Sequence, residues 1–481
     1  MVRGLGRSLG RTTRGGFAGR LASVLVPVQL TVLVGAAAAW AAPPGPSVGS
    51  SGPTAGLPGD LPAYRTAAGA QAVRGTPAPA NAPRIGPGTY TDTLASGDEK
   101  FYAVRLDGKS SAYFSAVAAP RPGTEVADHT DSLKVVLQDA DGSTCAPGGS
   151  TSFRGRSMAY PIADYATRRI DGPRTNCQQA GTYYLVVKRV GRAKTGATAR
   201  WPVELRVQRE PGLTGTPPAQ PGPGTWSTAT PVPLSGGTTK EARGGTGFND
   251  AGAVGKGVWR DRIKPGETRF YRVPLDWGQQ LSVSAELPQA ALSGSGTKSA
   301  GRGVAGSRLV ASALGLGVYN PARGPVSDTR FVPYDGKPAA AKFLTAPVDY
   351  GNRYNATAPV NAMRFAGSYY LAVSLHPDAA KYFEDGAQFT LRVDPLGRPQ
   401  RAPGYREDAA EFSVTPQERT AADTGPRPQQ DEHNGALRLV GYAGISTGTV
   451  LLLVMGVWTV MARRGGGRSA EPGGPDGRPV S

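Results

Sequence analysis

Short segments in which apolar side chains occupy every second position recur along the chain. Tyr102, Val104 and Leu106 are apolar, whereas the positions between them are mixed. A period of two is typical of a β-strand with one face in a hydrophobic core and the other toward solvent. Residues 133–137 are rich in valine and leucine, and turn dipeptides such as Asp141-Gly142 separate such segments. The pattern predicts a mainly β protein of the sandwich or barrel class.

Four segments of the first half have a counterpart in the second half, and their order is unchanged. The pairs are 100–106 with 269–275, 134–139 with 316–320, 180–187 with 366–373, and 203–207 with 389–393. The third pair is the clearest, AGTYYLVV against AGSYYLAV. We therefore predict two tandem domains of one fold, at residues 85–210 and 253–397, each large enough to have its own core.

Each copy carries a tyrosine pair, Tyr183-Tyr184 and Tyr369-Tyr370. Neighbours on a strand point to opposite faces. One ring of each pair is therefore expected in the core, while the other covers a neighbouring strand or stacks on a ligand.

The N-terminus has the layout of an export signal. Its leader carries arginine at positions 3, 7, 11, 14 and 20 and no acidic residue, and residues 21–42 are uncharged. The segment Ala39-Trp40-Ala41 fits the small-residue pattern of a cleavage site. We predict a secretory signal peptide at residues 1–41, with an uncleaved signal anchor as the alternative.

A second apolar segment lies near the C-terminus. Residues 439–462 carry no charge, and Arg463 and Arg464 follow at once. About 20 apolar residues in a helix cross a bilayer, and positive charge flanks the cytoplasmic side. We predict a transmembrane helix at 437–462, anchored in the lipid bilayer, and a cytoplasmic tail at 463–481. The protein would then be a single-pass protein of the cell membrane with its N-terminus outside.

The chain is rich in glycine and proline, with 67 Gly and 43 Pro in 481 residues. The excess is concentrated in stretches without hydrophobic periodicity, as in linkers. We place linkers at residues 42–84 and 211–252, and a polar stalk at 398–436.

The formal net charge is +18. Outside a cell, a positive surface favours contact with anionic lipid head groups or anionic wall polymers, although an arginine-rich soluble surface is the plainer explanation. Nucleic acid is not expected as a partner, because the chain is exported and has no recognition helix or stacking motif.

The two cysteines, Cys145 and Cys177, lie in the first predicted domain. An even number of cysteines in an exported chain favours a disulfide. A metal site is the weaker alternative, because the spacing is wrong and no histidine is close.

Residues that could support catalysis are sparse. The three histidines, His129, His376 and His433, are far apart in the sequence. A G-x-S-x-G match at residues 444–448 lies in the predicted membrane span and not on a strand-to-helix turn, so it lacks the required context. Asp139 and Asp141 flank a turn and are too few for a calcium site. We expect no enzyme activity, no cofactor and no bound metal.

Several motifs together resemble a known family. Residues 88–94 (GTYTDTL) and 97–104 (GDEKFYAV), the turn after 135–139, and the closing segment GTYYLVV at 181–187 resemble the bacterial pre-peptidase C-terminal domain. The resemblance implies two divergent jelly-roll-like β-sandwiches, each an accessory module of a secreted protein without catalytic activity. No peptidase domain accompanies the two copies.

These observations predict a surface-displayed, membrane-anchored, non-catalytic binding or scaffold protein. Its partner would be an anionic cell-wall polymer or another exported protein. The alternative is an accessory subunit of a membrane-associated enzyme or secretion complex.

Overall fold

The computed structural model describes residues 61–425 apart from short gaps. The gaps are residues 125, 128, 147–148, 171–175, 192–198, 220, 223–225, 227, 229–233, 235–237 and 294–307. All described residues fall within one compact unit of the chain. The predicted signal peptide, transmembrane helix and cytoplasmic tail lie outside the described residues. Within residues 61–425 as described, no helix is both long and apolar enough to cross a membrane.

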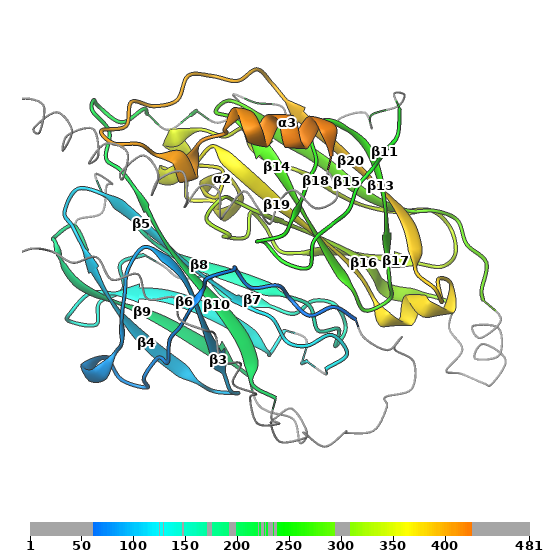
Figure 1. Ribbon diagram of the computed structural model, residues 1–481, viewed down its shortest axis with the longest axis horizontal. Helices are drawn as coiled ribbons and strands as arrows, with labels where there is room; N and C mark the ends of the chain where they lie inside the picture. Colours follow the sequence, from blue (N-terminus) through cyan, green and yellow to red (C-terminus); the bar gives the residue numbers. More distant parts are fainter. Residues whose placement is uncertain are drawn as a thin grey trace, which may run out of the picture. The chain divides into compact units, whose positions relative to one another are not determined.

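The first half of the described chain forms a β-sandwich, here called sandwich 1 (Figure 1, blue to green). Its strands are β1 (Gln71–Ala72), β2 (Arg84–Ile85), β3 (Gly88–Leu94), β4 (Glu99–Leu106), β5 (Ser111–Ala118), β6 (Ser132–Gln138), β7 (Thr151–Ser152), β8 (Ile162–Arg168), β9 (Gly181–Val190) and β10 (Trp201–Glu210). The inner sheet has the order β1-β3-β10-β5-β8, and the outer sheet has the order β2-β4-β9-β6-β7.

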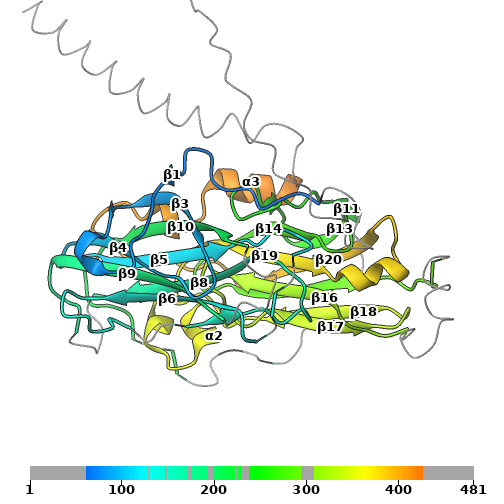
Figure 2. The ribbon, with the colours of Figure 1, turned by 90° about the horizontal axis from the view of Figure 1, so that it is seen from below.

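The second half repeats this arrangement as sandwich 2 (Figure 2, green to yellow). Its strands are β11 (Lys240–Glu241), β12 (Gly252–Ala253), β13 (Gly257–Ile263), β14 (Thr268–Leu275), β15 (Gln280–Leu287), β16 (Val310–Tyr319), β17 (Arg330–Tyr334), β18 (Ala339–Leu344), β19 (Gly367–Leu375) and β20 (Ala387–Leu396). The inner sheet has the order β12-β14-β19-β16-β17, and the outer sheet has the order β11-β13-β20-β15-β18. Each strand of sandwich 1 thus has a counterpart in sandwich 2.

The prediction of a mainly β protein with two sandwiches is confirmed. In each copy, successive long strands alternate between the two sheets, which is the connectivity of a jelly roll. The predicted inward positions also hold, since Tyr102 and Val104 are buried and Arg105 is exposed. Tyr183 and Tyr369 lie in the cores, whereas Tyr184 and Tyr370 are only half-buried on the opposite faces.

The repeat extends into segments that we expected to be linkers. In sandwich 1, Asp92 accepts hydrogen bonds from the Tyr102 hydroxyl (2.8 Å) and the Gly75 amide (2.8 Å). In sandwich 2, Asp261 accepts them from the Tyr271 hydroxyl (2.7 Å) and the Gly244 amide (2.6 Å). Four short strands that lack periodicity flank these glycines and pair in parallel with the longer strands: β1, β2, β11 and β12.

The carboxyl group of Asp92 is ionised in this network. Burial raises its pKa, but hydrogen bonds from Lys100, Gly75, Thr93 and Tyr102 outweigh this effect and hold the pKa below its ordinary value. The network fixes the segment before β2 against the body of the sandwich, because the charged acceptor satisfies a backbone amide and a buried phenol at once.

The part of the predicted stalk that is described, residues 398–425, is folded against both sandwiches. It contains η4 (Ala410–Phe412) and α3 (Pro416–Thr424), which begins at a Thr415–Glu418 capping box (Figure 1, orange). Glu407 and Glu411 pair with arginines of β10, while α3 contacts β12 and β14. The segment lacks strand periodicity because its apolar contacts, such as Phe412, are few and irregularly spaced.

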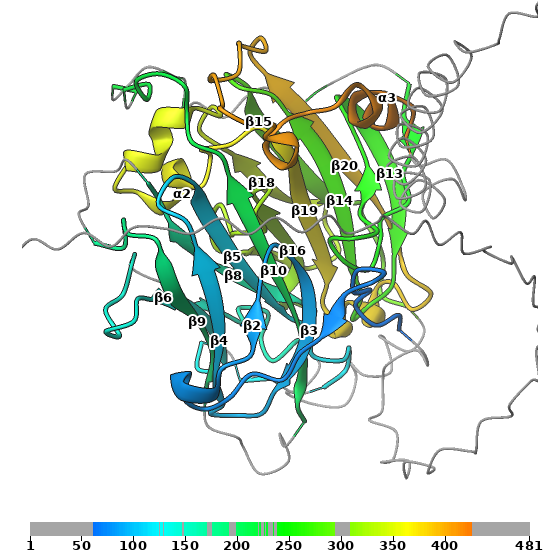
Figure 3. The same ribbon diagram turned by 60° about the vertical axis from the view of Figure 1, so that its left-hand side comes forward.

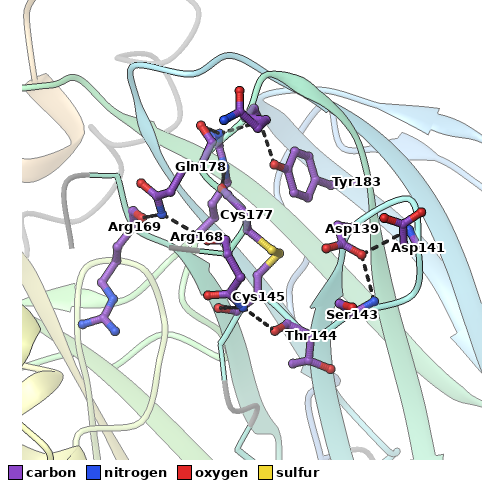
Figure 4. Close-up of a disulfide and its surroundings, with 12 residues drawn as sticks. Asp139, Asp141, Ser143, Thr144, Cys145, Arg168, Arg169, Cys177, Gln178 and Tyr183 are labelled. Carbon is purple, nitrogen blue, oxygen red and sulfur yellow. Dashed lines mark hydrogen bonds between the residues drawn. A yellow bond between two sulfur atoms is a disulfide. The ribbon is translucent and has the colours of Figure 1, made fainter. Parts of the chain in front are cut away.

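The remaining short helices lie in loops: η1 (Pro79–Asn81), η2 (Tyr350–Tyr354), α2 (Ala358–Asn361) and η3 (Pro377–Lys381). The predicted disulfide between Cys145 and Cys177 is confirmed (Figure 4). It joins the turn after β6 to the segment before β9. Beside it, Asp139 accepts hydrogen bonds from the amides of Asp141 and Ser143, as expected for a turn residue.

The inner sheets of the two sandwiches pack against each other. In Figure 3, β5 and β8 of sandwich 1 lie beside β16 and β19 of sandwich 2. Val117 of β5 and Ala163 of β8 share a buried apolar cluster with Phe270 of β14, Tyr319 of β16 and Ala372 of β19. As a result, β5 is buried on both faces along its whole length. The outer sheets do not contribute to this apolar cluster, so one face of each outer sheet points away from the interface.

Buried ion pairs reinforce the interface. Glu210 of β10 accepts two hydrogen bonds from Arg353 of η2, at 2.8 Å and 3.1 Å, and the side chains of both residues are at most 1% exposed. The hydroxyls of Tyr113 and Tyr405 also donate to Glu210. A second pair joins Glu204 to Arg323. The carboxylates are therefore paired and hydrogen-bonded, as burial of charge requires.

Candidate functional site

A hollow lies at the edge of sandwich 2, where the open face of the outer sheet meets β17 of the inner sheet. Along β15, the side chains of Leu281, Val283 and Ala285 enter the core, so those of Ser282 and Ser284 point to the other face. There they line a hollow of about 440 Å³, together with residues of β17, β18 and β20. The alternation that builds the core of sandwich 2 thus also places polar groups on this face.

A second hollow, of about 460 Å³, adjoins the first along the same strands. It is lined by Arg260, Glu286, Gln388 and Thr390, among others. Glu286 lies opposite Thr390, two residues along from the pair Ser284 and Arg392 in the first hollow. The two hollows are therefore neighbours along β15 and β20, with the Glu286–Arg392 ion pair between them, and together they are here called the groove.

Three of the charged side chains in the groove are paired with an opposite charge. Glu286 binds the Arg392 Nε with both carboxylate oxygens, at 3.0 Å and 3.1 Å. Asp394 lies 2.7 Å from the Lys256 amine. The Leu234 carbonyl also accepts from Arg392, so the guanidinium is held in place.

Two further cations in the first hollow have no such partner. Arg330 and Lys342 are both exposed, and the described residues include no ion pair or hydrogen bond for either side chain. The Arg330 guanidinium lies 5.2 Å from the centre of the Phe343 ring, a cation–π contact that orients it. The first hollow thus carries an uncompensated positive charge.

The corresponding face of sandwich 1 is closed. Ser115, Tyr165 and Arg206 lie side by side on β5, β8 and β10, just as Ser284, Lys342 and Arg392 do on β15, β18 and β20. These two groups of three residues occupy equivalent positions in the two copies. Both serines are buried, but the half-buried Tyr165 contacts Arg364 of sandwich 2 through its hydroxyl, whereas Lys342 is exposed. Only the second copy presents this face openly.

The residues that the sequence suggested for chemistry do not come together in the groove. His376 is buried beside η3, where its Nδ1 accepts a hydrogen bond from the Asp378 amide (3.1 Å). Asp139 belongs to a turn of sandwich 1, while His433 and residues 444–448 lie outside the described residues. The part of the chain that the structure describes contains no group of three or more His, Cys, Asp or Glu that could hold a metal ion.

The groove residues themselves were missed in the sequence. Ser282 and Ser284 alternate with apolar positions, as on any solvent-facing strand, and this signal does not distinguish a groove from an ordinary surface. The repeat offers a better signal, because the aromatic Tyr165 of the first copy is replaced by Lys342 in the second.

Comparisons with known proteins give only distant likenesses. No protein-family description and no curated protein matches the chain. Among solved structures, the CUB1-EGF-CUB2 domains of human MASP-1/3 are 8% identical and cover 64% of this chain and 99% of their own, with a TM-score of 0.16. Tandem CBM51 modules of a family 98 glycoside hydrolase from Streptococcus pneumoniae are 9% identical, cover 64% of this chain and 83% of their own, and have a TM-score of 0.18. At these scores the likeness supports no inference, and the resemblance to the pre-peptidase C-terminal family stays a prediction.

Proposed function

We propose that this chain is a surface-displayed, membrane-anchored, non-catalytic binding protein whose ligand occupies the groove of sandwich 2. The difference between the two copies carries the proposal. The Tyr165 hydroxyl of sandwich 1 contacts Arg364 of sandwich 2, whereas Lys342 at the equivalent position is exposed and lines a hollow. One copy serves as a support and the other presents a recognition surface.

The docking of the two sandwiches supports this division. The ion pair of Glu210 with Arg353 and the covering segment at residues 398–425 hold the copies together. A groove on a rigid body loses little conformational entropy when it binds a ligand. Contacts that hold the two sandwiches together are also what a scaffold protein would need.

The composition of the groove supports binding without catalysis. Its polar groups are serine hydroxyls, guanidinium and amine groups, and carboxylates that are already paired with Arg392 and Lys256. A hydrolytic site needs a nucleophile within hydrogen-bonding distance of a base. Ser284 donates to Glu286, but both oxygens of that carboxylate already bind the Arg392 guanidinium.

Site-specific cross-linking in intact cells tests the proposal. A photo-reactive residue would replace Ser282 in the groove of the full-length protein, and in a control it would replace the exposed Arg105 on the outer sheet of sandwich 1. We expect one defined product, identified by mass spectrometry, from position 282 and none from position 105. Equal products from both positions would contradict a groove-specific ligand.

The same experiment distinguishes the alternative function. A single exported protein captured in stoichiometric amount from position 105 would favour an accessory subunit that docks through sandwich 1. Anchoring has a separate test, in which a stop codon before residue 437 should release the protein from the membrane fraction into the medium. Retention of the truncated protein with the membrane would contradict an anchor at 437–462.

A further inference from the structure

We infer that the groove binds an extended anionic carbohydrate or polyol chain, with an acidic group of the chain held between Arg330 and Lys342. The inference rests on the proposed function, since it names the ligand class of the same surface. It is carried by the charges of the first hollow and by the position of the second hollow beside it on the same strands.

The charge of the first hollow selects an anion. Arg392 is paired with Glu286, and Asp394 is paired with Lys256. The two positive charges of the first hollow that remain unpaired are those of Arg330 and Lys342. Stacking on Phe343 restrains the Arg330 guanidinium. A planar guanidinium pairs with a carboxylate or phosphate through two parallel hydrogen bonds, and a lysine beside it adds a point charge.

The shape of the groove selects an extended chain. The hollows of about 440 Å³ and 460 Å³ are neighbours along β15, since Ser284 lines the first and Glu286 lines the second. A compact anion would fill only the first hollow and leave the second unused. A chain that crosses both would pass from the cationic rim toward Gln388 and Thr390.

The other polar groups suit hydroxyl-bearing units. Ser282, Thr390 and Gln388 offer hydroxyl and amide groups that both donate and accept hydrogen bonds. Sugar and polyol hydroxyls also do both. Half-buried apolar side chains such as Phe343 and Leu344 add non-polar contact, a common composition of ligand sites.

Binding of defined polymers to the full-length protein in detergent tests the inference. The probes are polygalacturonate, which carries carboxylates, poly(glycerol phosphate), which carries phosphodiesters, and neutral dextran. We expect binding to at least one of the polyanions and not to dextran, weakened by added salt. Comparison of the two polyanions distinguishes the acidic group.

The variant Arg330→Ala/Lys342→Ala should weaken polyanion binding by about tenfold or more, because each residue makes a charge-assisted contact. The matched control is Arg105→Ala/Lys109→Ala, which removes the same charge from exposed positions of sandwich 1. Thermal unfolding of each variant shows that the fold is retained. Equal losses in both variants would mean that net charge attracts the polymer, and the inference would fail.

A steric variant, Ser282→Trp, separates failure of the ligand class from failure of the groove. An indole at this position would fill part of the first hollow without changing its charge, and it should abolish polyanion binding. If no polyanion binds the wild-type protein while position 282 still gives a cross-linked product in cells, the ligand class is wrong and the proposed function stands. If neither polymers nor cross-links are found, both are overturned.

Discussion

The ion pair between Glu210 and Arg353 is the sharpest test of how the sandwiches are held together. Glu210→Gln keeps the shape of the side chain but removes its charge. Arg353 then stays buried, fully covered and without a counter-charge. Breaking one member of a buried pair costs about 3–5 kcal/mol. The glutamine oxygen can still accept one of the hydrogen bonds, so we expect a loss near the lower limit, about 3 kcal/mol.

The measurement is urea-induced unfolding of the full-length protein in detergent at pH 7, followed by tryptophan fluorescence. A double-mutant cycle adds Arg353→Met and the double variant. Because the pair is coupled, the double variant should lose less stability than the sum of the single changes, by about 2 kcal/mol or more. Additivity within about 0.5 kcal/mol would refute the idea that this pair joins the two sandwiches.

The pH dependence of the same pair provides a second check. Burial raises the pKa of Glu210, but the Arg353 charge and the hydrogen bonds from Arg353, Tyr113 and Tyr405 outweigh it, so its pKa lies below the ordinary value. A depressed pKa stabilises the fold above the pKa of the unfolded state, about 4.3, and this contribution is lost as pH falls through the folded-state pKa. Wild type should therefore lose its advantage over Glu210→Gln on acidification below about pH 4. A constant difference down to pH 2 would contradict this.

Three other changes have expected outcomes. Burial raises the pKa of Asp164 to about 7, although the Val135 amide donates a hydrogen bond to it. A raised carboxyl pKa destabilises the fold as pH rises from about 4 to 7. Asp164→Asn should therefore increase the free energy of unfolding, measured in urea, by about 2–4 kcal/mol at pH 8 and by little at pH 4. Gly75→Ala should cost about 1–3 kcal/mol in thermal unfolding, because its methyl group would come within 2.6 Å of Tyr102; an unchanged midpoint would contradict this crowding. Replacing Cys145 and Cys177 by serine opens a loop with a sequence separation of 32 residues and should cost about 3–4 kcal/mol; equal stability of the oxidised wild type and this variant would argue against that contribution.

The repeat shows how far sequence reasoning reaches. The pairing of 134–139 with 316–320 is confirmed, since both segments end in the same turn. Asp139 accepts from the amides two and four residues later, and Asn320 does the same in the second copy. Turn chemistry is local, so it can be read from a few residues.

The short strands β1, β2, β11 and β12 could not be predicted in this way. Each has two residues, too few to show a period, and each is held by parallel pairing and by the acceptors Asp92 and Asp261. The residues that hold these short strands, Asp92 and Asp261, come later in the chain, on the longer strands β3 and β13. The covering segment at 398–425 was missed for a related reason, because its partners lie far away in the sequence.

The sequence by itself determined that the chain is mainly β, that it contains two copies of one fold, and that Cys145 pairs with Cys177. Alternation, repetition and cysteine count are properties of the chain alone. Only the tertiary structure decided that the inner sheets dock, which brings Tyr165 into contact with Arg364, whereas Lys342 at the equivalent position stays exposed. The physical reason is that strand periodicity distinguishes two faces of a sheet but does not say what covers the second one. That depends on the free energy of contacts between distant segments, such as Glu210 with Arg353.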